Sequence, residues 1–357
     1  MTVNETLGAW SELFMLLAAM TYLVSFVAFA WDMAAHSKTL RGTAEAEDRE
    51  LVGAATAGAG AQDAAEPADA RAGHGAGHRG RGYRTGARSA LAGHVADEQM
   101  RYTGERRPAA RVAVAVMVLA FLVHAAAVVS RAFAAGRVPW GNMYEFCTTG
   151  ALVVAGVYLL ALLARDLRFV GTLVSGLVVI MLCAATIGFP TPVGPLQPAL
   201  QSWWLVIHVS IAVAASGVFT ITFAMAVLQL LQARRERAIL AGQAPGMDFL
   251  RMVPSAQALE NLSFRLNAVG FAFWTFTLAA GAIWAEQAWG RYWGWDTKEV
   301  WTFVIWVVYA AYMHARATRG WTGTRSAWLS IAGYLCIIFN FTVVNTLFAG
   351  LHSYAGV

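Results

Sequence analysis

The stretch of sequence with the greatest chemical potential is an aromatic segment that runs from Trp284 to Trp301. It holds five of the 14 tryptophans of the chain. These alternate with two glycines and two carboxylates, namely Gly290, Gly294, Asp296 and Glu299. Indole rings offer large apolar faces, and glycine lets a flat ligand approach the backbone. An interfacial belt explains one or two tryptophans per helix end but not five, so the segment favours a planar hydrophobic ligand.

Histidines are the second group that could do chemistry, because neutral imidazole is a common metal ligand. His208 lies near the start of an apolar run, about 8 Å below the surface at ~1.5 Å per helical residue, and His352 follows the last run. We predict both on the same membrane face as the aromatic segment. Either one alone could simply be a hydrogen-bonding group between helices. Together, beside an indole platform, they have the parts for axial ligation of a haem iron.

Two further histidines lie deeper in apolar runs. His314 and His124 are expected about 10 Å apart in depth across a core of about 30 Å, which disfavours one haem held between them. For His314 we predict a second ligand from another subunit, with His124 as the in-chain alternative. A packed polar role for His124 is equally open. His36, just after the first run, is expected to have no special role.

The elements that must position these residues are apolar runs long enough to cross a membrane. The chain is 58% hydrophobic and 13% charged, with a mean hydropathy of +0.52, whereas soluble domains carry about 25% charged residues. Eight apolar runs stand out, at residues 11–31, 111–132, 146–164, 169–188, 203–231, 266–286, 299–315 and 326–349. The sequence therefore predicts an all-α polytopic membrane protein with about eight transmembrane helices.

The distribution of basic residues predicts how these helices are oriented. With both termini outside, 22 of the 26 Lys and Arg residues fall in inner segments. The other four are Arg131, Arg137, Arg291 and Lys298. This bias satisfies the positive-inside rule and survives omission of the long first inner segment. We therefore expect a multi-pass protein of the cell membrane whose active face lies outside the cytoplasm. Met1–Gly8 lacks the basic start of a cleavable signal peptide.

A long polar insertion separates the first two apolar runs. Residues 42–100 are rich in Ala, Gly, Arg and acidic residues and have almost no large apolar side chains, which predicts disorder. Three histidines in it, His74, His78 and His94, are expected to be solvated, with a weak metal or haem contact as the alternative. The predicted organisation is a first transmembrane helix (1–31), a cytoplasmic, largely disordered insertion (32–110) and a seven-helix membrane domain (111–357) that carries the outer segment 284–301.

Composition also excludes some classes of protein. The three cysteines, Cys147, Cys183 and Cys336, are far apart and form no Cys-x-x-Cys pair, which argues against a dithiol redox enzyme and against a thiolate zinc site. The net charge of +5 comes from basic residues scattered over several loops. It therefore predicts topology signals rather than a nucleic-acid-binding surface.

The pattern Trp289-Gly290-x-x-Trp293-x-Trp295-Asp296-x-x-Glu299 resembles the tryptophan-rich WWD segment of the haem-handling membrane proteins of cytochrome c biogenesis. The likeness extends to the surroundings of three histidines: Ile207-His208-Val209-Ser210, His314 after Ala310-Ala311-Tyr312-Met313, and Gly350-Leu351-His352-Ser353-Tyr354. The order of elements is most similar to the CcsA (ResC) branch of the System II cytochrome c synthase. The resemblance covers roughly residues 110–357 and the first run, while the insertion 42–100 departs from it.

This resemblance implies a subunit that takes haem b from the cytoplasmic side to the outer face and attaches it covalently to the Cys-x-x-Cys-His motif of apocytochrome c. It implies that His208 and His352 hold the iron, preferably ferrous, and that they and Asp296 take part directly in the reaction. The residues expected to bind the porphyrin are Trp289, Trp293, Trp295, Asp296 and Glu299. For Asp296 and Glu299, the sequence leaves open whether they orient tryptophan N–H groups or arginines or interact with haem or substrate. His314 would belong to an inner haem site whose second ligand comes from a CcsB/ResB-type membrane partner. The lack of a cysteine pair implies a separate thioredoxin-like reductant for the apocytochrome, and membrane lipid would surround the helices.

Three other functions stay open. A related WWD protein could export or chaperone haem without making thioether bonds. A b-haem electron-transfer subunit would need histidine pairs at matching depth, and here His208 with His352 comes nearest to that. A transporter with an aromatic gate is the third possibility.

Overall fold

The computed structural model describes residues 3–62, 97–102, 107–243, 246–318 and 320–352, and within these ranges the chain forms helices and no strands. The long helices are α1 (Glu5–Gln62), α3 (Pro108–Ala135), α4 (Met143–Ala164), α5 (Gly171–Cys183), α6 (Trp204–Leu240), α7 (Ala256–Trp289), α8 (Thr297–Ala317) and α9 (Thr324–Phe339). Two π-helical turns, η2 (Ala184–Gly188) and η5 (Asn340–Val344), extend α5 and α9, and the short α10 (Asn345–Leu347) follows η5. Short 3-10 turns also occur, at η1 (Arg168–Val170), η3 (Pro198–Leu200) and η4 (Asp248–Met252). The all-α prediction is confirmed.

Seven helical segments of the described chain are long and apolar enough to cross a membrane, one fewer than predicted. The exception is α8, which contains the predicted run 299–315. Its first turn carries Lys298 and Glu299 and its last turns carry His314 and Arg316. These polar ends leave α8 with a shorter apolar stretch than its neighbours. The chain is a multi-pass membrane protein by the length and composition of the other seven.

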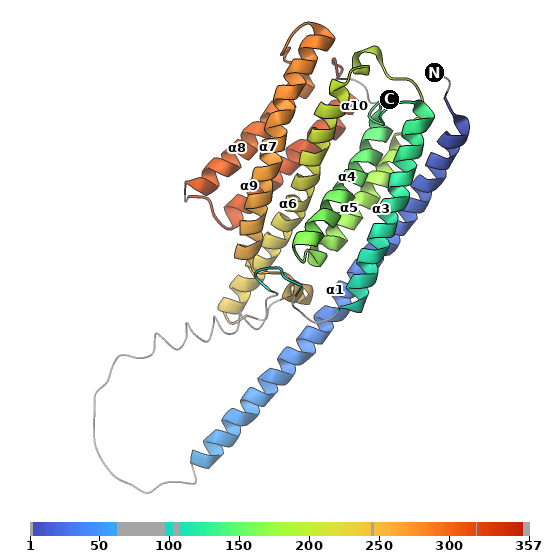
Figure 1. The fold of residues 1–357 in the computed structure, drawn as a ribbon. Helices are drawn as coiled ribbons and strands as arrows, with labels where there is room; N and C mark the ends of the chain where they lie inside the picture. The colour runs from blue at the N-terminus through green and yellow to red at the C-terminus, as the bar shows by residue number, and fades with distance from the viewer. Residues whose placement is uncertain (1–2, 63–96, 103–106, 244–245, 319, 353–357) are drawn as a thin grey trace.

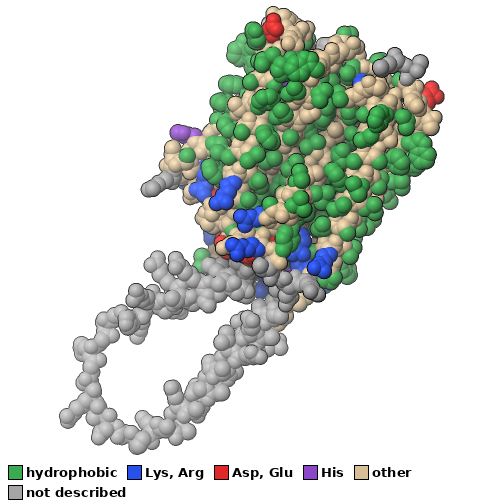
Figure 2. Space-filling model, viewed as in Figure 1, with side chains coloured by type: hydrophobic (Ala, Val, Ile, Leu, Met, Phe, Trp, Pro, Cys, Tyr) green, Lys and Arg blue, Asp and Glu red, His purple; other side chains and the backbone are tan. Residues whose placement is uncertain are grey.

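The helices pack in two groups that meet at α6 (Figure 1). The first group consists of α1, α3, α4 and α5, whose shared core includes Tyr22, Met117, Tyr158 and Leu182. In the second group, α7, α8 and α9 pack with α6 around Phe219, which stacks on the ring of Tyr309. The apolar side chains that remain on the outside cover much of the bundle surface (Figure 2).

The first helix continues well beyond the predicted end of its apolar run. α1 extends to Gln62, and Asp32 forms an ion pair with Arg107 just before α3. Residues 97–102, which lie within the predicted insertion, contact the loop after α4, where the Met100 carbonyl accepts a hydrogen bond from the Asp166 N–H (2.7 Å). Residues 63–96 of the predicted insertion, which include His74, His78 and His94, lie outside the described residues. The disorder predicted for them stays a prediction.

The start of α1 and the short helix α10 lie at the same end of the bundle (Figure 1). Lys and Arg side chains gather at the opposite end, while the upper part of the visible face has almost none (Figure 2). This clustering of Lys and Arg at one end of the bundle agrees with their uneven distribution over the predicted inner and outer segments. Which end faces the cytoplasm stays a prediction, because it depends on the positive-inside rule.

Candidate functional site

His208 lies in the second turn of α6 and faces α7. Its Nδ1 is 3.0 Å from the carbonyl oxygen of Thr277, so Nδ1 carries the proton that it donates and the lone pair lies on Nε2. The Trp284 ring contacts the imidazole edge-on at 5.6 Å between centroids. A Cβ on Gly281 would lie 2.7 Å from the imidazole Cε1, so glycine is needed there for α7 to approach this ring. α7 thus fixes both the position and the tautomer of His208.

His352 is held by the residue that begins α8. The imidazole Nδ1 lies 2.8 Å from Asp296 Oδ2, and Trp289 contacts the ring edge-on at 4.9 Å between centroids. Since a carboxylate only accepts, Nδ1 carries a proton, so the neutral imidazole has its lone pair on Nε2. The hydrogen bond from His352 holds the pKa of Asp296 below its ordinary value, although partial burial opposes this. A carboxylate behind a histidine is the usual way to orient a metal-ligating imidazole.

Asp296 and Glu299 also build the start of α8. Asp296 is the N-cap, and Glu299 Oε2 accepts hydrogen bonds from the backbone N–H groups of Gly294 (2.8 Å) and Asp296 (3.1 Å). This reciprocal arrangement is a capping box, whose Asp-x-x-Glu spacing is readable in the sequence. The sequence prediction assigned both carboxylates to haem without separating their roles. In the structure, the Asp296 side chain contacts His352, whereas the Glu299 side chain holds the loop that precedes α8.

Between the two histidines lies a cavity with two lobes. The space enclosed by the lobes is about 100 and 130 Å³, and both lobes are partly open at the surface of the protein. They share six lining residues: His208, Ala212, Trp284, Lys298, Phe341 and His352. The first lobe is completed by Trp274, Trp289, Trp293 and Glu299. Residues from elsewhere in the chain, including Trp140, Asn142, Met143, Phe146, Leu200 and Leu205, complete the second lobe. The two imidazoles therefore lie where the lobes meet.

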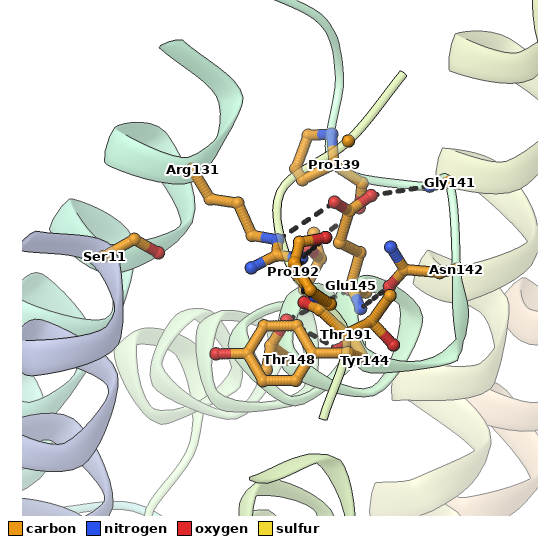
Figure 3. A network of polar contacts seen from close by, with 12 residues as sticks. Ser11, Arg131, Pro139, Gly141, Asn142, Tyr144, Glu145, Thr148, Thr191 and Pro192 are labelled. Carbon is orange, nitrogen blue, oxygen red and sulfur yellow. Dashed lines mark hydrogen bonds and ion pairs between the residues drawn. The ribbon is translucent and has the colours of Figure 1, made fainter. Parts of the chain in front are cut away.

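A buried ionic network holds the loops that wall the second lobe (Figure 3). The Glu145 carboxylate, 0% exposed, binds Arg131 Nε (2.9 Å), Arg137 (2.7 Å) and the Gly141 N–H (2.7 Å). Both arginines also donate to carbonyl oxygens of the proline-rich loop, at residues 191–194. The network thus ties the loop between α3 and α4 to the loop before α6. These two loops supply Trp140 and Leu200 to the cavity.

The tryptophans of the aromatic segment do not share one environment. Trp289 and Trp293 line the first lobe. Trp295 lines neither lobe, is 76% exposed and adopts a φ of +60°, a region that is strained for a bulky side chain. Its indole contacts Trp293 edge-on at 5.9 Å between ring centroids. Trp295 therefore lies outside the two lobes beside Trp293, and its predicted contact with haem stays a prediction.

The deeper histidines lie in different parts of the bundle. His314 is exposed on α8, in the second helix group. His124 is fully buried on α3 in the first group, edge-on to the Tyr22 ring of α1. The two histidines thus lie on helices of different groups, and the prediction that they do not hold one haem between them stays a prediction. The exposure of His314 leaves its imidazole accessible to a partner subunit.

Several lining residues were missed by the sequence prediction. Trp274, Phe341, Phe146 and Trp140 come from four separate segments, and no motif links them in the sequence. Lys298 lines both lobes although the sequence suggested only a topology role for it. The sequence signal for the second lobe is the density of aromatic and proline residues in the loop between α3 and α4 and in the loop before α6.

Replacing Asp296 by Asn tests the support of His352. Asn is as good an N-cap as Asp, so α8 should keep its start, but the neutral amide orients the imidazole less firmly. We expect haem affinity to fall about tenfold or more, as for other residues that support metal-bound histidines. Haem titration of the purified complex followed by absorbance measures it. Unchanged affinity in Asp296→Asn would show that the carboxylate is needed for capping alone.

The fold and the cavity define a multi-pass helical membrane protein with a histidine-paired, aromatic-lined site at one end of its bundle. Comparison with known families identifies the particular class. The family model described as "Cytochrome C assembly protein" matches residues 140–352, which include all the residues that line the two lobes. The chain therefore belongs to the cytochrome c assembly protein family, and the predicted resemblance is confirmed.

Curated relatives show which branch of the family this chain is similar to. The chain is 32% identical over 278 residues to "Cytochrome c biogenesis protein CcsA" of Microcystis aeruginosa, covering 66% of this chain and 85% of the relative. It is 36% identical over 235 residues to the CcsA protein of Guillardia theta, covering 61% and 77%, respectively. Among solved structures, "Cytochrome c Heme Lyase CcmF" superposes with a TM-score of 0.49 at 18% identity, covering 81% of this chain and 52% of that one. The chain spans about half the length of that structure.

Proposed function

We propose that this protein is the haem-handling subunit of a cytochrome c synthase. It receives haem b from the cytoplasmic side, holds it in the two-lobed cavity and presents it to the Cys-x-x-Cys-His motif of apocytochrome c for covalent attachment. The cavity lies on the outer face of the cell membrane, and a CcsB/ResB-type membrane protein completes the enzyme. A thioredoxin-like reductant keeps the apocytochrome thiols reduced.

One observation carries this proposal. His208 and His352, which are far apart in the sequence, line one cavity, and both imidazoles have the tautomer with the lone pair on Nε2. That is a tautomer in which imidazole ligates a metal. The indoles around them, such as Trp289 and Trp293, suit a flat apolar macrocycle. Donor chemistry and lining therefore fit a haem, whose iron His208 and His352 would hold.

The bound haem supplies two vinyl groups, and each cysteine thiol adds across one of them to form a thioether, with the thiol proton going to the terminal vinyl carbon. The protein contributes position. His208 and His352 orient the macrocycle, Asp296 orients His352, and the aromatic walls limit access of water. Holding thiol and vinyl in near-attack geometry converts a bimolecular step into an effectively unimolecular one. The histidine of the apocytochrome motif replaces one of the two histidines of this chain.

His314 serves an earlier stage of the same path. Its imidazole is exposed on α8 and lies in a different helix group from His124. We assign it to an inner haem site whose second ligand comes from the partner subunit. Ionisable side chains in such helices are costly unless they have a partner, which supports this assignment.

Co-expression with the partner and a secreted Cys-x-x-Cys-His reporter tests the proposed function. We expect the reporter to retain haem through denaturing electrophoresis, because thioether bonds survive unfolding. A reporter whose two cysteines are replaced by alanine is the matched control and should lose its haem. If the purified complex contains haem but the intact reporter never gains it covalently, the protein is a carrier or exporter of haem instead.

A further inference from the structure

Haem carries two propionate groups that are ionised at neutral pH, and a cation in a mostly apolar cavity would stabilise a propionate that is buried there. Among the described residues that line the two lobes, Lys298 is the only Lys or Arg. It lines both lobes and also the small cleft beside them that Asp296 and Gly350 border. Lys298 therefore lies beside both histidines at the junction of the cavity.

The Lys298 ammonium group is held in place by the turn that follows α9. Its Nζ donates to the carbonyl oxygen of Asn340 (2.9 Å) and to Asn345 Oδ1 (2.7 Å), and it lies 4.5 Å from the centre of the Phe341 ring. Asn340 and Phe341 belong to the π-helical turn η5, a distortion that is frequent at functional sites. An ammonium group has three donors. Two are used by these neutral acceptors, so the third is available to a ligand.

Electrostatics at this position favour an anionic ligand. Burial lowers the pKa of Lys298 to about 7, and the nearby Asp296 carboxylate offsets this only in part. The Asp296 carboxylate is itself engaged with His352 and Leu351. A carboxylate brought into the cavity would therefore stabilise the ammonium form of Lys298.

The other basic residues near this end of the bundle do not line the lobes. Arg131 and Arg137 are paired with Glu145 and with backbone carbonyl groups. Arg291 lies over Gly294, where its guanidinium occupies the space that a Cβ would need, and it borders neither lobe. Of these basic side chains, Lys298 is thus the one that lines the cavity and can contact a ligand there.

We propose that Lys298 binds a haem propionate and thereby sets which edge of the macrocycle enters the cavity junction. The assignment rests on the proposed function, because it assumes that haem occupies the lobes. In haem b the propionates and the vinyls lie on opposite halves of the ring. A propionate bound to Lys298 therefore turns the vinyl-bearing half of the ring away from the π-helical turn. That half is then accessible to the thiols of the apocytochrome.

Titration of the purified complex with haem b and with haem dimethyl ester, whose propionates are uncharged, tests the proposal. The intact protein should bind haem b about tenfold or more tightly than the ester, since a charge-assisted hydrogen bond is lost with the ester. Lys298→Met should bind both forms equally, with the affinity that the intact protein has for the ester. Lys298→Arg should restore much of the preference. Arg291→Met is the matched control and should keep the full preference.

Two results would overturn the assignment. Equal binding of haem b and ester by the intact protein, with the absorbance of bis-histidine ligation in both, would show that no cation reads the propionates. A preference for haem b that persists in Lys298→Met would place the cation elsewhere. Both results leave the proposed function intact, whereas failure of the intact protein to bind either form would remove the proposed function and this assignment with it. Comparing two ligands on the intact protein keeps the test valid even if a variant folds poorly.

Discussion

Alanine at His208 or His352 is expected to remove the bis-histidine haem spectrum of the purified complex and to lower covalent haem on the reporter at least about a hundredfold. Loss of a group that only supports a metal ligand already costs 10- to 100-fold, and loss of the ligand itself should cost more. The double variant should show no haem at the cavity. Absorbance of the reduced complex and haem staining of the reporter measure the two effects.

Chemical complementation separates ligation from folding in these variants. Each alanine leaves space where an imidazole stood, so millimolar imidazole should restore part of the spectrum and part of the reporter haem. His208→Phe, which fills the space without a nitrogen, is the control that imidazole should not restore. A bis-histidine spectrum that persists in the His208→Ala, His352→Ala double variant would remove both histidines from the ligand assignment.

Replacing Glu145 by Gln is expected to cause the largest loss of stability. The carboxylate is fully buried between Arg131 and Arg137, so the variant leaves the buried guanidinium group of Arg131 and the partly buried one of Arg137 without their counter-charge. Removing one partner of a buried ion pair typically costs about 3–5 kcal/mol. The two loops of the second lobe should separate, and the complex should unfold at a lower temperature and lose haem. Thermal unfolding in detergent, with haem absorbance as a second signal, measures both.

The matched control for this variant is Glu286→Gln. Glu286 is an exposed carboxylate near the end of α7 at the same end of the bundle, and its replacement should change stability by less than about 0.5 kcal/mol. Glu145→Asp should recover part of the stability, because it restores the charge at a shorter reach. A Glu145→Gln variant as stable as the intact complex would show that the network does not hold the loops.

The sequence was sufficient to predict the helical elements and two of the site residues that matter most. Each predicted apolar run lies in a helix, because runs of about 20 apolar residues have few alternatives to a membrane helix. His208 and His352 could be paired from their depth alone, since helical rise converts residue number into distance. The prediction of eight spans was one too many among the described residues, because the polar ends of α8 shorten its apolar run.

Other features could not be predicted because they depend on how helices pack. Nothing in the spacing of residues 290–296 distinguishes Trp293, which lines the cavity, from Trp295, which is mostly exposed with a left-handed backbone. The role of Asp296 was open until its carboxylate was found 2.8 Å from the His352 imidazole. Periodicity reports which face of a helix is apolar, but it does not report which side chains of other helices meet that face.

The aromatic segment 284–301 and its flanking histidines were therefore sufficient to predict a haem site, which stays a prediction, and to predict the family, which is confirmed. The tertiary structure decided the extent of the site. The second lobe comes from loops around Trp140 and Leu200 that a buried ion network holds, and Lys298 reaches the cavity because a π-helical turn after α9 binds its ammonium group. The physical reason is that local sequence dictates helices and their ends, whereas the walls of a cavity are formed by contacts between segments that sequence spacing does not relate.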